Sequence, residues 1–177
     1  MVASQPSASL QAWMNEGARQ ERGGQLEAAL QAYDAALALD PSHAPALEAR
    51  ALALADLGQF DAAAETAQAL ISRRPSYPYG YKILAYAELQ AGRVEAAVVA
   101  YGQLVALVPT AAEAHSDRAV ALMQLKRYDE ALAGFDAALK HAPKDPVFHN
   151  NRGNALKALG RAEEAVAAYE RAIMVRG

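Results

Sequence analysis

The sequence predicts an all-α fold built from one helix pair that recurs along the chain. Pro41, Pro75, Pro109 and Pro143 follow one another at intervals of 34 residues, and such a fixed period indicates one supersecondary unit copied and stacked. Roughly a quarter of the 177 residues are alanine, the best helix former, and strand-like runs of Val, Ile and Thr are absent. A stacked array presents a long groove without built-in chemistry, so the period favours a binding protein over an enzyme.

Composition excludes several other classes. The net charge of −3 and the pI of about 5.8 do not suggest a nucleic-acid binder, and the absence of cysteine excludes disulfides and thiolate chemistry. No apolar stretch approaches the ~18 residues needed to span a membrane. Residues 1–10 have neither the basic nor the apolar part of a signal peptide, so we expect a cytoplasmic protein. A chain trimmed of its signal would look the same.

The units become visible when each periodic proline is placed at slot 32 of 34. We expect an N-terminal extension at 1–9, partly disordered, and a single domain at 10–177. The five repeats are 10–43, 44–77, 78–111, 112–145 and 146–177. Slot 8 is always Gly or Ala, slot 20 is always Ala, and slot 24 is aromatic in four repeats. Small residues where two helix backbones approach, beside a bulky one where the gap opens, suit close helix packing.

Each repeat also carries a turn between two helices. Gly24, Gly58, Gly92 and Gly160 can adopt the left-handed conformation that ends a helix, and Lys126 fills this place in the fourth repeat. An acidic residue follows each turn, at the positive end of the next helix. The slot-32 proline then ends the second helix. The expected helices are 8–22, 25–39, 44–57, 60–73, 78–91, 94–107, 112–125, 128–141, 146–159 and 162–175.

From Leu10 onward this pattern resembles the tetratricopeptide repeat (TPR) family. The resemblance implies an α-solenoid, a right-handed superhelix of five antiparallel helix pairs whose first helices line a concave groove. Three slots depart from the family pattern, and one of them is slot 11, usually large and apolar, which is Gln20 in the first repeat and Glu88 in the third. Slot 4, often Trp or Tyr, is His115 and His149 in the last two repeats, and slot 7, commonly Leu, is Arg50, Arg118 and Arg152 in three repeats. These arginines either extend into the groove or pair with an acid on a neighbouring helix.

By analogy with the family, slots 2, 5, 6, 9, 12 and 13 of each first helix face the groove. The candidate binding residues are Glu48, Leu52, Tyr79, Lys82, Ile83, Tyr86, Asp117, Val120, Asn150, Asn151 and Asn154. The middle of this surface is apolar, and a contiguous apolar patch usually marks a partner site, although some of these side chains can instead pack between helices. The asparagines can hold the backbone of an extended peptide, or they simply match the repeat consensus.

Charge limits the kind of ligand. Chaperone-binding members of the family hold a C-terminal carboxylate with Lys, Asn and Arg, and no three successive repeats here match that pattern. The groove slots carry five acids and three bases, so we expect a protein or peptide ligand that is apolar to mildly basic.

Catalytic and metal sites are not expected. No nucleophile motif or glycine-rich phosphate loop is present. His115 and His149 occupy equivalent slots on neighbouring helices, where side chains point the same way and do not converge on a metal. We therefore expect no cofactor.

No repeat follows the helix expected at 162–175 in this sequence, so either the array associates through this end or the chain is a piece of a longer protein. Val166, Tyr169 and Ile173 are therefore candidates for a contact between copies of the chain.

The leading hypothesis is a non-catalytic bacterial scaffold that binds a peptide or helix of a partner protein. One alternative is the substrate-recognition arm of a larger enzyme, because residues 150–165 resemble TPR arms that precede bacterial glycosyltransferase domains. The other alternative is a self-assembling structural array.

Overall fold

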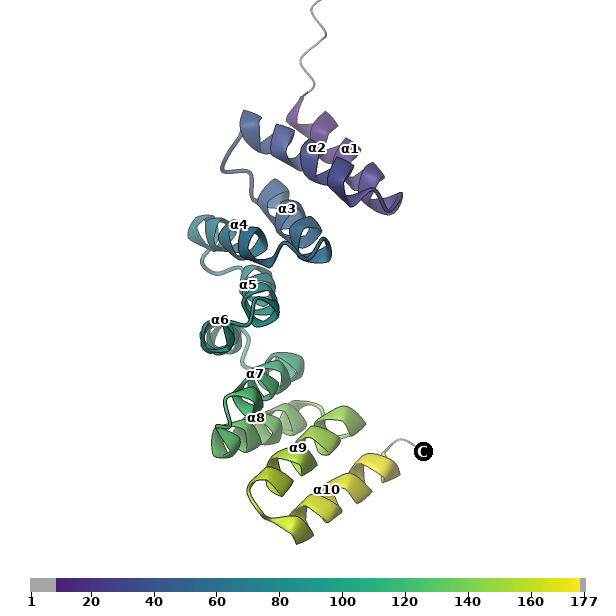
Figure 1. The fold of residues 1–177 in the computed structure, drawn as a ribbon, viewed down its shortest axis with the longest axis vertical. Helices are drawn as coiled ribbons and strands as arrows, with labels where there is room; N and C mark the ends of the chain where they lie inside the picture. The colour runs from purple at the N-terminus through teal and green to yellow at the C-terminus, as the bar shows by residue number, and fades with distance from the viewer. Residues whose placement is uncertain (1–8, 176–177) are drawn as a thin grey trace, which may run out of the picture. The chain divides into compact units, whose positions relative to one another are not determined.

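The computed structural model describes residues 9–175, which form ten α-helices and no strand (Figure 1). The helices are α1 (Leu10–Arg22), α2 (Leu26–Leu39), α3 (Ala44–Asp56), α4 (Phe60–Arg73), α5 (Pro78–Gln90), α6 (Val94–Leu107), α7 (Ala112–Gln124), α8 (Tyr128–His141), α9 (Pro146–Ala158) and α10 (Ala162–Met174). The predicted all-α fold is confirmed, and each helix begins and ends within two residues of its predicted bound. The expected disorder at 1–9 falls almost wholly outside the described residues.

The helices are grouped into two compact units, which divide inside α5 at Ala87 and Glu88. In the first unit, α2 packs against α1 and α3, and α3 packs against α4. In the second unit, successive helices from α6 to α10 pack in the same sequential manner. Each unit is therefore a stack of helix pairs, as the period predicts. The expectation of one domain over 10–177 stays a prediction.

The turn inside each repeat is formed by a residue with positive φ. Gly24, Gly58, Gly92 and Gly160 have φ between 73° and 78°, and Lys126 has φ 58°. The amide after the turn then donates back across it, as Arg127 does to the Leu122 carbonyl at 3.0 Å. This bond satisfies a carbonyl that the end of the helix would otherwise leave unpaired.

Close packing inside a pair depends on slots 8 and 24. A Cβ added to Gly17 would lie 2.3 Å from Tyr33, and one added to Gly153 would lie 2.4 Å from Tyr169. Both distances are far below van der Waals contact, so a side chain is excluded while the ring keeps its place. The first and last repeats therefore pair a glycine with a tyrosine at these two slots.

Slot 4 links three repeats to the proline turn before them. Tyr81 donates its hydroxyl to the Pro75 carbonyl at 3.1 Å, and His115 and His149 donate Nε2–H to the carbonyls of Pro109 and Pro143 at 2.8 and 2.9 Å. A carbonyl can only accept a hydrogen bond, so Nε2 of each of these two histidines carries a proton. The polar residues at slot 4 therefore join neighbouring repeats, a role that the sequence did not reveal.

Candidate functional site

The first unit presents an aromatic surface formed by α5, the residue before it and the start of α4, which we name the tyrosine patch (Tyr77, Tyr79, Tyr86 and Phe60). Tyr79 and Tyr86 lie two turns apart on one helix face and are 39% and 45% exposed. The Tyr86 ring meets Phe60 of α4 edge-on at 6.3 Å, and Tyr77 meets Tyr79 edge-on at 6.4 Å. Rings held in this way offer contact area with little loss of rotamer freedom on binding.

Polar partners hold Tyr77 in the patch. Its hydroxyl donates to Glu48 Oε2 at 2.9 Å, and the Arg74 guanidinium lies 4.5 Å from the centre of its ring. The hydrogen bond to Glu48, followed by partial burial, raises the pKa of Tyr77 above its usual value. Glu48 is thus engaged by the protein itself. The groove slots do not include Tyr77, Arg74 or Phe60. Four tyrosines lie within residues 77–86, and this crowding is a sequence signal that could have found Tyr77.

Other candidates in the first unit lie deeper. Ile83 is only 3% exposed and packs in a core cluster with Ala51 and Ala67, so it stabilises the packing of the helices and is not available to a ligand. Leu52 is half-buried against the same cluster, whereas Lys82 is exposed. Of the candidates on α5, Tyr79, Lys82 and Tyr86 therefore lie at the surface and Ile83 lies in the core.

In the second unit, the asparagines divide by depth. Asn150 and Asn154 are exposed on α9 and Asn151 is half-buried. Asn154 Oδ1 accepts a hydrogen bond from the Tyr169 hydroxyl at 2.9 Å, so its amide group is already oriented. Asp117 and Val120 on α7 are half-buried, and Val120 packs against the core of this unit.

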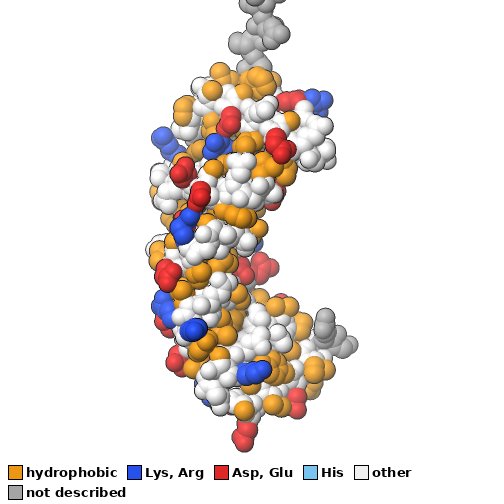
Figure 2. All heavy atoms as spheres, viewed as in Figure 1, with side chains coloured by type: hydrophobic (Ala, Val, Ile, Leu, Met, Phe, Trp, Pro, Cys, Tyr) orange, Lys and Arg blue, Asp and Glu red, His pale blue; other side chains and the backbone are white. Residues whose placement is uncertain are grey.

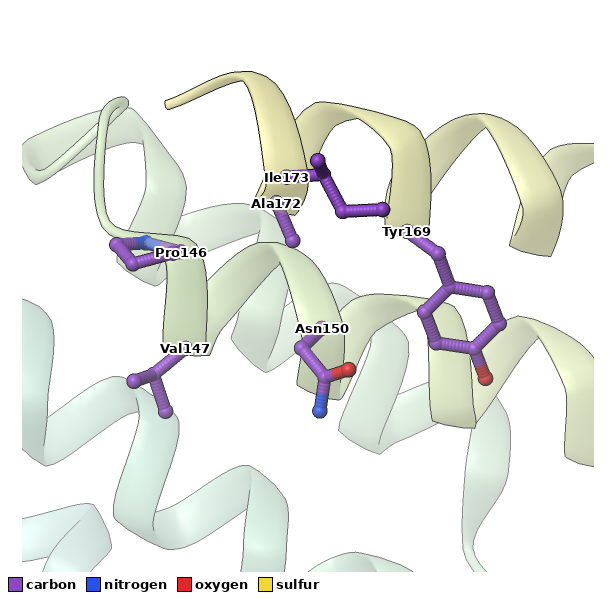
Figure 3. Close-up of a pocket in the computed structure, with 6 residues that line it drawn as sticks. All are labelled: Pro146, Val147, Asn150, Tyr169, Ala172 and Ile173. Atoms are coloured by element: carbon purple, nitrogen blue, oxygen red, sulfur yellow. The ribbon is translucent and has the colours of Figure 1, made fainter. Parts of the chain in front are cut away.

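A pocket of about 550 Å³ lies between α9 and α10 (Figure 3). Its walls are mainly apolar, and the polar side-chain groups among the lining residues are the Asn150 amide and the Tyr169 hydroxyl. The lining residues are Pro146, Val147, Asn150, Tyr169, Ala172 and Ile173.

The pocket continues onto an exposed face of α10. Ile173 is 73% exposed and Val166 is 55% exposed. The residues that match Val166 in the two preceding repeats, Val98 and Leu132, are only 5% and 8% exposed. Within residues 9–175, no further helix covers α10 as α9 covers α8. Tyr169, the third candidate for a contact between copies, is half-buried.

The arginines at slot 7 turn towards second helices. Arg50 Nε lies 2.6 Å from Asp34 Oδ1 of α2, and Arg152 Nε lies 2.6 Å from Asp136 Oδ1 of α8. Of the two interpretations of these residues, the ion pair is therefore confirmed for Arg50 and Arg152.

Neither a metal-binding cluster nor a membrane-spanning helix is present among the described residues. Within 9–175, no three His, Asp or Glu side chains gather where they could hold a metal ion. None of the described helices combines the length and apolarity that a membrane span requires. On the face that Figure 2 shows, basic side chains are scattered among acidic ones.

Known proteins give the class of the fold. Tetratricopeptide-repeat family models match residues 14–78 and 48–112, residues 88–154 and residues 146–176. The chain therefore belongs to the tetratricopeptide repeat family, as the resemblance predicted. No curated protein matches it.

Three solved structures illustrate the likeness in fold. A MamA crystal structure is 21% identical with a TM-score of 0.90, covering 94% of this chain and 91% of that one. MamA from Desulfovibrio magneticus RS-1 is 17% identical with a TM-score of 0.88, covering 98% and 97%. YrrB, described as a TPR protein with an unusual peptide-binding site, is 21% identical with a TM-score of 0.82, covering 95% and 87%. At these identities the likeness shows the fold.

Proposed function

We propose that this chain is a non-catalytic scaffold that binds a peptide or helix of a partner protein along its first helices. The observation that carries the proposal is the tyrosine patch, in which two large aromatic side chains of one helix face are exposed together. Isolated exposed apolar residues need no explanation, but clustered tyrosines are typical of the energetic centre of an interface. The peptide-binding site of YrrB, a protein of similar fold, adds support.

The ligand in this proposal is apolar to mildly basic. Aromatic rings supply most of the contact area of the patch, and Glu48 lies at its edge, bonded to Tyr77. A basic side chain of the ligand can approach this carboxylate, whereas an acidic one is repelled. Within the second unit, Asn150 and Asn154 are proposed to hold the backbone of an extended ligand through their amide groups.

A peptide selection tests the patch. Peptides selected from a random library on the wild-type chain are synthesised, and their Kd is measured by calorimetry on Tyr79→Ala/Tyr86→Ala. We expect a loss of at least about tenfold, since each truncation removes a ring that anchors an interface. Leu39→Ala, which truncates an exposed residue of α2, is the matched control and should leave Kd unchanged. Unchanged affinity in the double variant, with helicity intact by circular dichroism, removes the patch from the binding surface.

A second candidate function is self-association through α10. The observation that favours it is the exposure of Val166, whose counterparts Val98 and Leu132 are buried in the two preceding repeats, together with the exposure of Ile173. Contiguous exposed apolar surface of this kind favours association. Val166→Lys/Ile173→Lys should yield a monomer by light scattering if wild type is an oligomer. An oligomer that survives both charges, or a wild-type chain that is monomeric at high concentration, contradicts this candidate.

A further inference from the structure

Three repeats place an arginine at slot 7, and two of these arginines have a carboxylate partner one repeat earlier. Arg50 pairs with Asp34 and Arg152 pairs with Asp136, each at 2.6 Å from Nε and each across 16 residues of sequence. Arg50 also donates Nη1–H to the hydroxyl of Thr66. The partner carboxylate always comes from slot 25, on the second helix of the preceding repeat.

The third arginine, Arg118 on α7, lacks this partner. Its slot-25 position is Gly102 on α6, and the position that matches Thr66 is Gly134 on α8. Arg118 Nε is buried and has no hydrogen-bond partner in the described residues. Glu130, whose pKa Arg118 helps to lower, is already held by two hydrogen bonds of 2.6 Å from Arg127. A partly desolvated guanidinium is thus left without a counter-charge, which is unfavourable unless something else supplies one.

Packing does not explain the glycine that removes the counter-charge. A Cβ at Gly102 would have Arg118 Nε as its nearest neighbour, at 3.7 Å, which is ordinary contact. At Gly134 the situation differs, because a Cβ there would lie 2.9 Å from the Cβ of Ala119. Glycine inside a helix is less stable than alanine. Gly102 therefore lowers the stability of α6 although a side chain would fit there. It stands at slot 25, where the repeats that precede Arg50 and Arg152 carry Asp34 and Asp136.

We propose that Arg118 binds an Asp or Glu carboxylate of a partner protein, on the side of the second unit formed by α6 and α8. Arg118 as a whole is half-buried, and its two Nη groups are not among the fully buried atoms without a partner, so solvent reaches them. Two Nη–H groups of one guanidinium can donate in parallel to the two oxygens of one carboxylate. The carboxylate of the partner supplies the charge that Asp34 and Asp136 supply within the chain.

This site is distinct from the tyrosine patch in place and in chemistry. The patch belongs to the first unit and favours an apolar or basic ligand, whereas Arg118 belongs to the second unit and selects an acid. Phosphate oxygens could use the same donors, but the two sister sites both hold a carboxylate, which is why we favour that ligand.

A counter-selection tests the proposal. Random peptides are selected on the full-length wild-type chain and depleted on Arg118→Gln, a variant that loses no hydrogen bond of the described fold. We expect the surviving peptides to carry Asp or Glu. Replacing that acid by its amide should weaken binding about tenfold on wild type and should have no further effect on Arg118→Gln.

Two further variants make the result decisive. Gly102→Asp recreates the internal pair and should weaken the same peptides about tenfold, whereas Gly102→Ala adds only a methyl group and should leave their Kd unchanged. Arg152→Gln removes an arginine that is already paired and should also have no effect. The proposal is overturned if no peptide survives depletion, if the survivors carry no acid, or if they bind Gly102→Asp as well as wild type. Arg118-dependent binding of inorganic phosphate without acidic peptides would overturn it in favour of a phosphate site.

Discussion

The glycine–tyrosine contact of the first repeat leads to the sharpest stability prediction. Gly17→Ala places a methyl group 2.3 Å from the Tyr33 ring, so the ring must move by about 1.1 Å to reach the 3.4 Å lower limit of ordinary contact. Tyr33 is 1% exposed, and its hydroxyl donates to Glu21 at 2.7 Å. The ring is therefore confined on all sides, and its movement disturbs both the core and that hydrogen bond.

The magnitude follows from two opposing contributions. Overpacking of a well-packed core costs roughly 1–3 kcal/mol, while replacing a helical glycine with alanine returns about 0.5–1 kcal/mol. Gly17→Ala should therefore destabilise the fold by about 1–2 kcal/mol. Gly153→Ala makes the same change against Tyr169, but that ring is half-buried and borders the α9–α10 pocket, so it can swing outward. We expect a cost of no more than about 0.5 kcal/mol there, because relief of the overpacking leaves the helix gain to offset it.

Urea unfolding followed by circular dichroism at 222 nm measures both variants, and hydrogen exchange locates the effect in α1 and α2. The lower stability of Gly17→Ala should be accompanied by faster amide exchange in the first helix pair. The reasoning is refuted if Gly17→Ala is as stable as wild type, or if Gly153→Ala is the more damaging of the two.

Two other predictions concern the backbone and pH. Lys126→Gly should raise the free energy of unfolding by about 0.5–1 kcal/mol, because relief of the left-handed conformation exceeds the added chain entropy of glycine. The urea midpoint should rise accordingly, and an unchanged midpoint would count against this prediction. Burial, with the hydrogen bond to Glu21, raises the pKa of Tyr33, so the unfolded chain releases this proton first. The contribution of Tyr33 to the free energy of unfolding should therefore be fully present below about pH 10 and be lost as the pH rises further. Tyr33→Phe should flatten that alkaline decline, leaving the smaller contribution of Tyr77; an equally steep decline would show that another group causes it.

The helix pairs could be predicted because their causes are local. A proline beyond the first turn ends a helix, and a glycine ends one where φ must be positive, so Gly24 and Pro41 determine their boundaries without reference to distant residues. Lys126 was predicted at the same kind of turn although its residue type disfavours it. There the surrounding period, and not the residue, was the informative signal.

The candidate site was less predictable because it depends on contacts between repeats. Groove slots taken from the family do not say which side chain at a slot is large enough to enter the core, and Ile83 packs there while Asn151, at the same slot, stays half-exposed. Likewise, the fate of an arginine at slot 7 depends on the residue 16 positions earlier, so Arg50 is paired and Arg118 is not. Reading slots 7 and 25 together would have separated the two cases.

A comparison of the outer faces of α1 and α10 predicts how copies of this chain can meet. At slot 10, the last four repeats all have an alanine that is 0% exposed: Ala53, Ala87, Ala121 and Ala155. The first repeat has Arg19 there, exposed and paired with Glu16 at 2.6 Å. A second copy cannot place α1 over α10 as α9 lies over α8, because the contact would desolvate this ion pair and force a long side chain into a space that fits a methyl group.

With the contact of α10 to α1 obstructed, we expect α10 to meet α10 of a second copy, and this association should end at two copies because a two-fold contact uses the same surface on both partners. Arg19→Ala with Glu16→Leu removes the obstruction and should allow α1 of one copy to meet α10 of the next. We expect this variant to form open-ended assemblies whose mean mass, measured by light scattering, grows with concentration. The combination of Arg19→Ala/Glu16→Leu with Ile173→Lys should abolish that growth. If the wild-type chain already assembles beyond two copies through α10, the ion pair of α1 does not act as a cap.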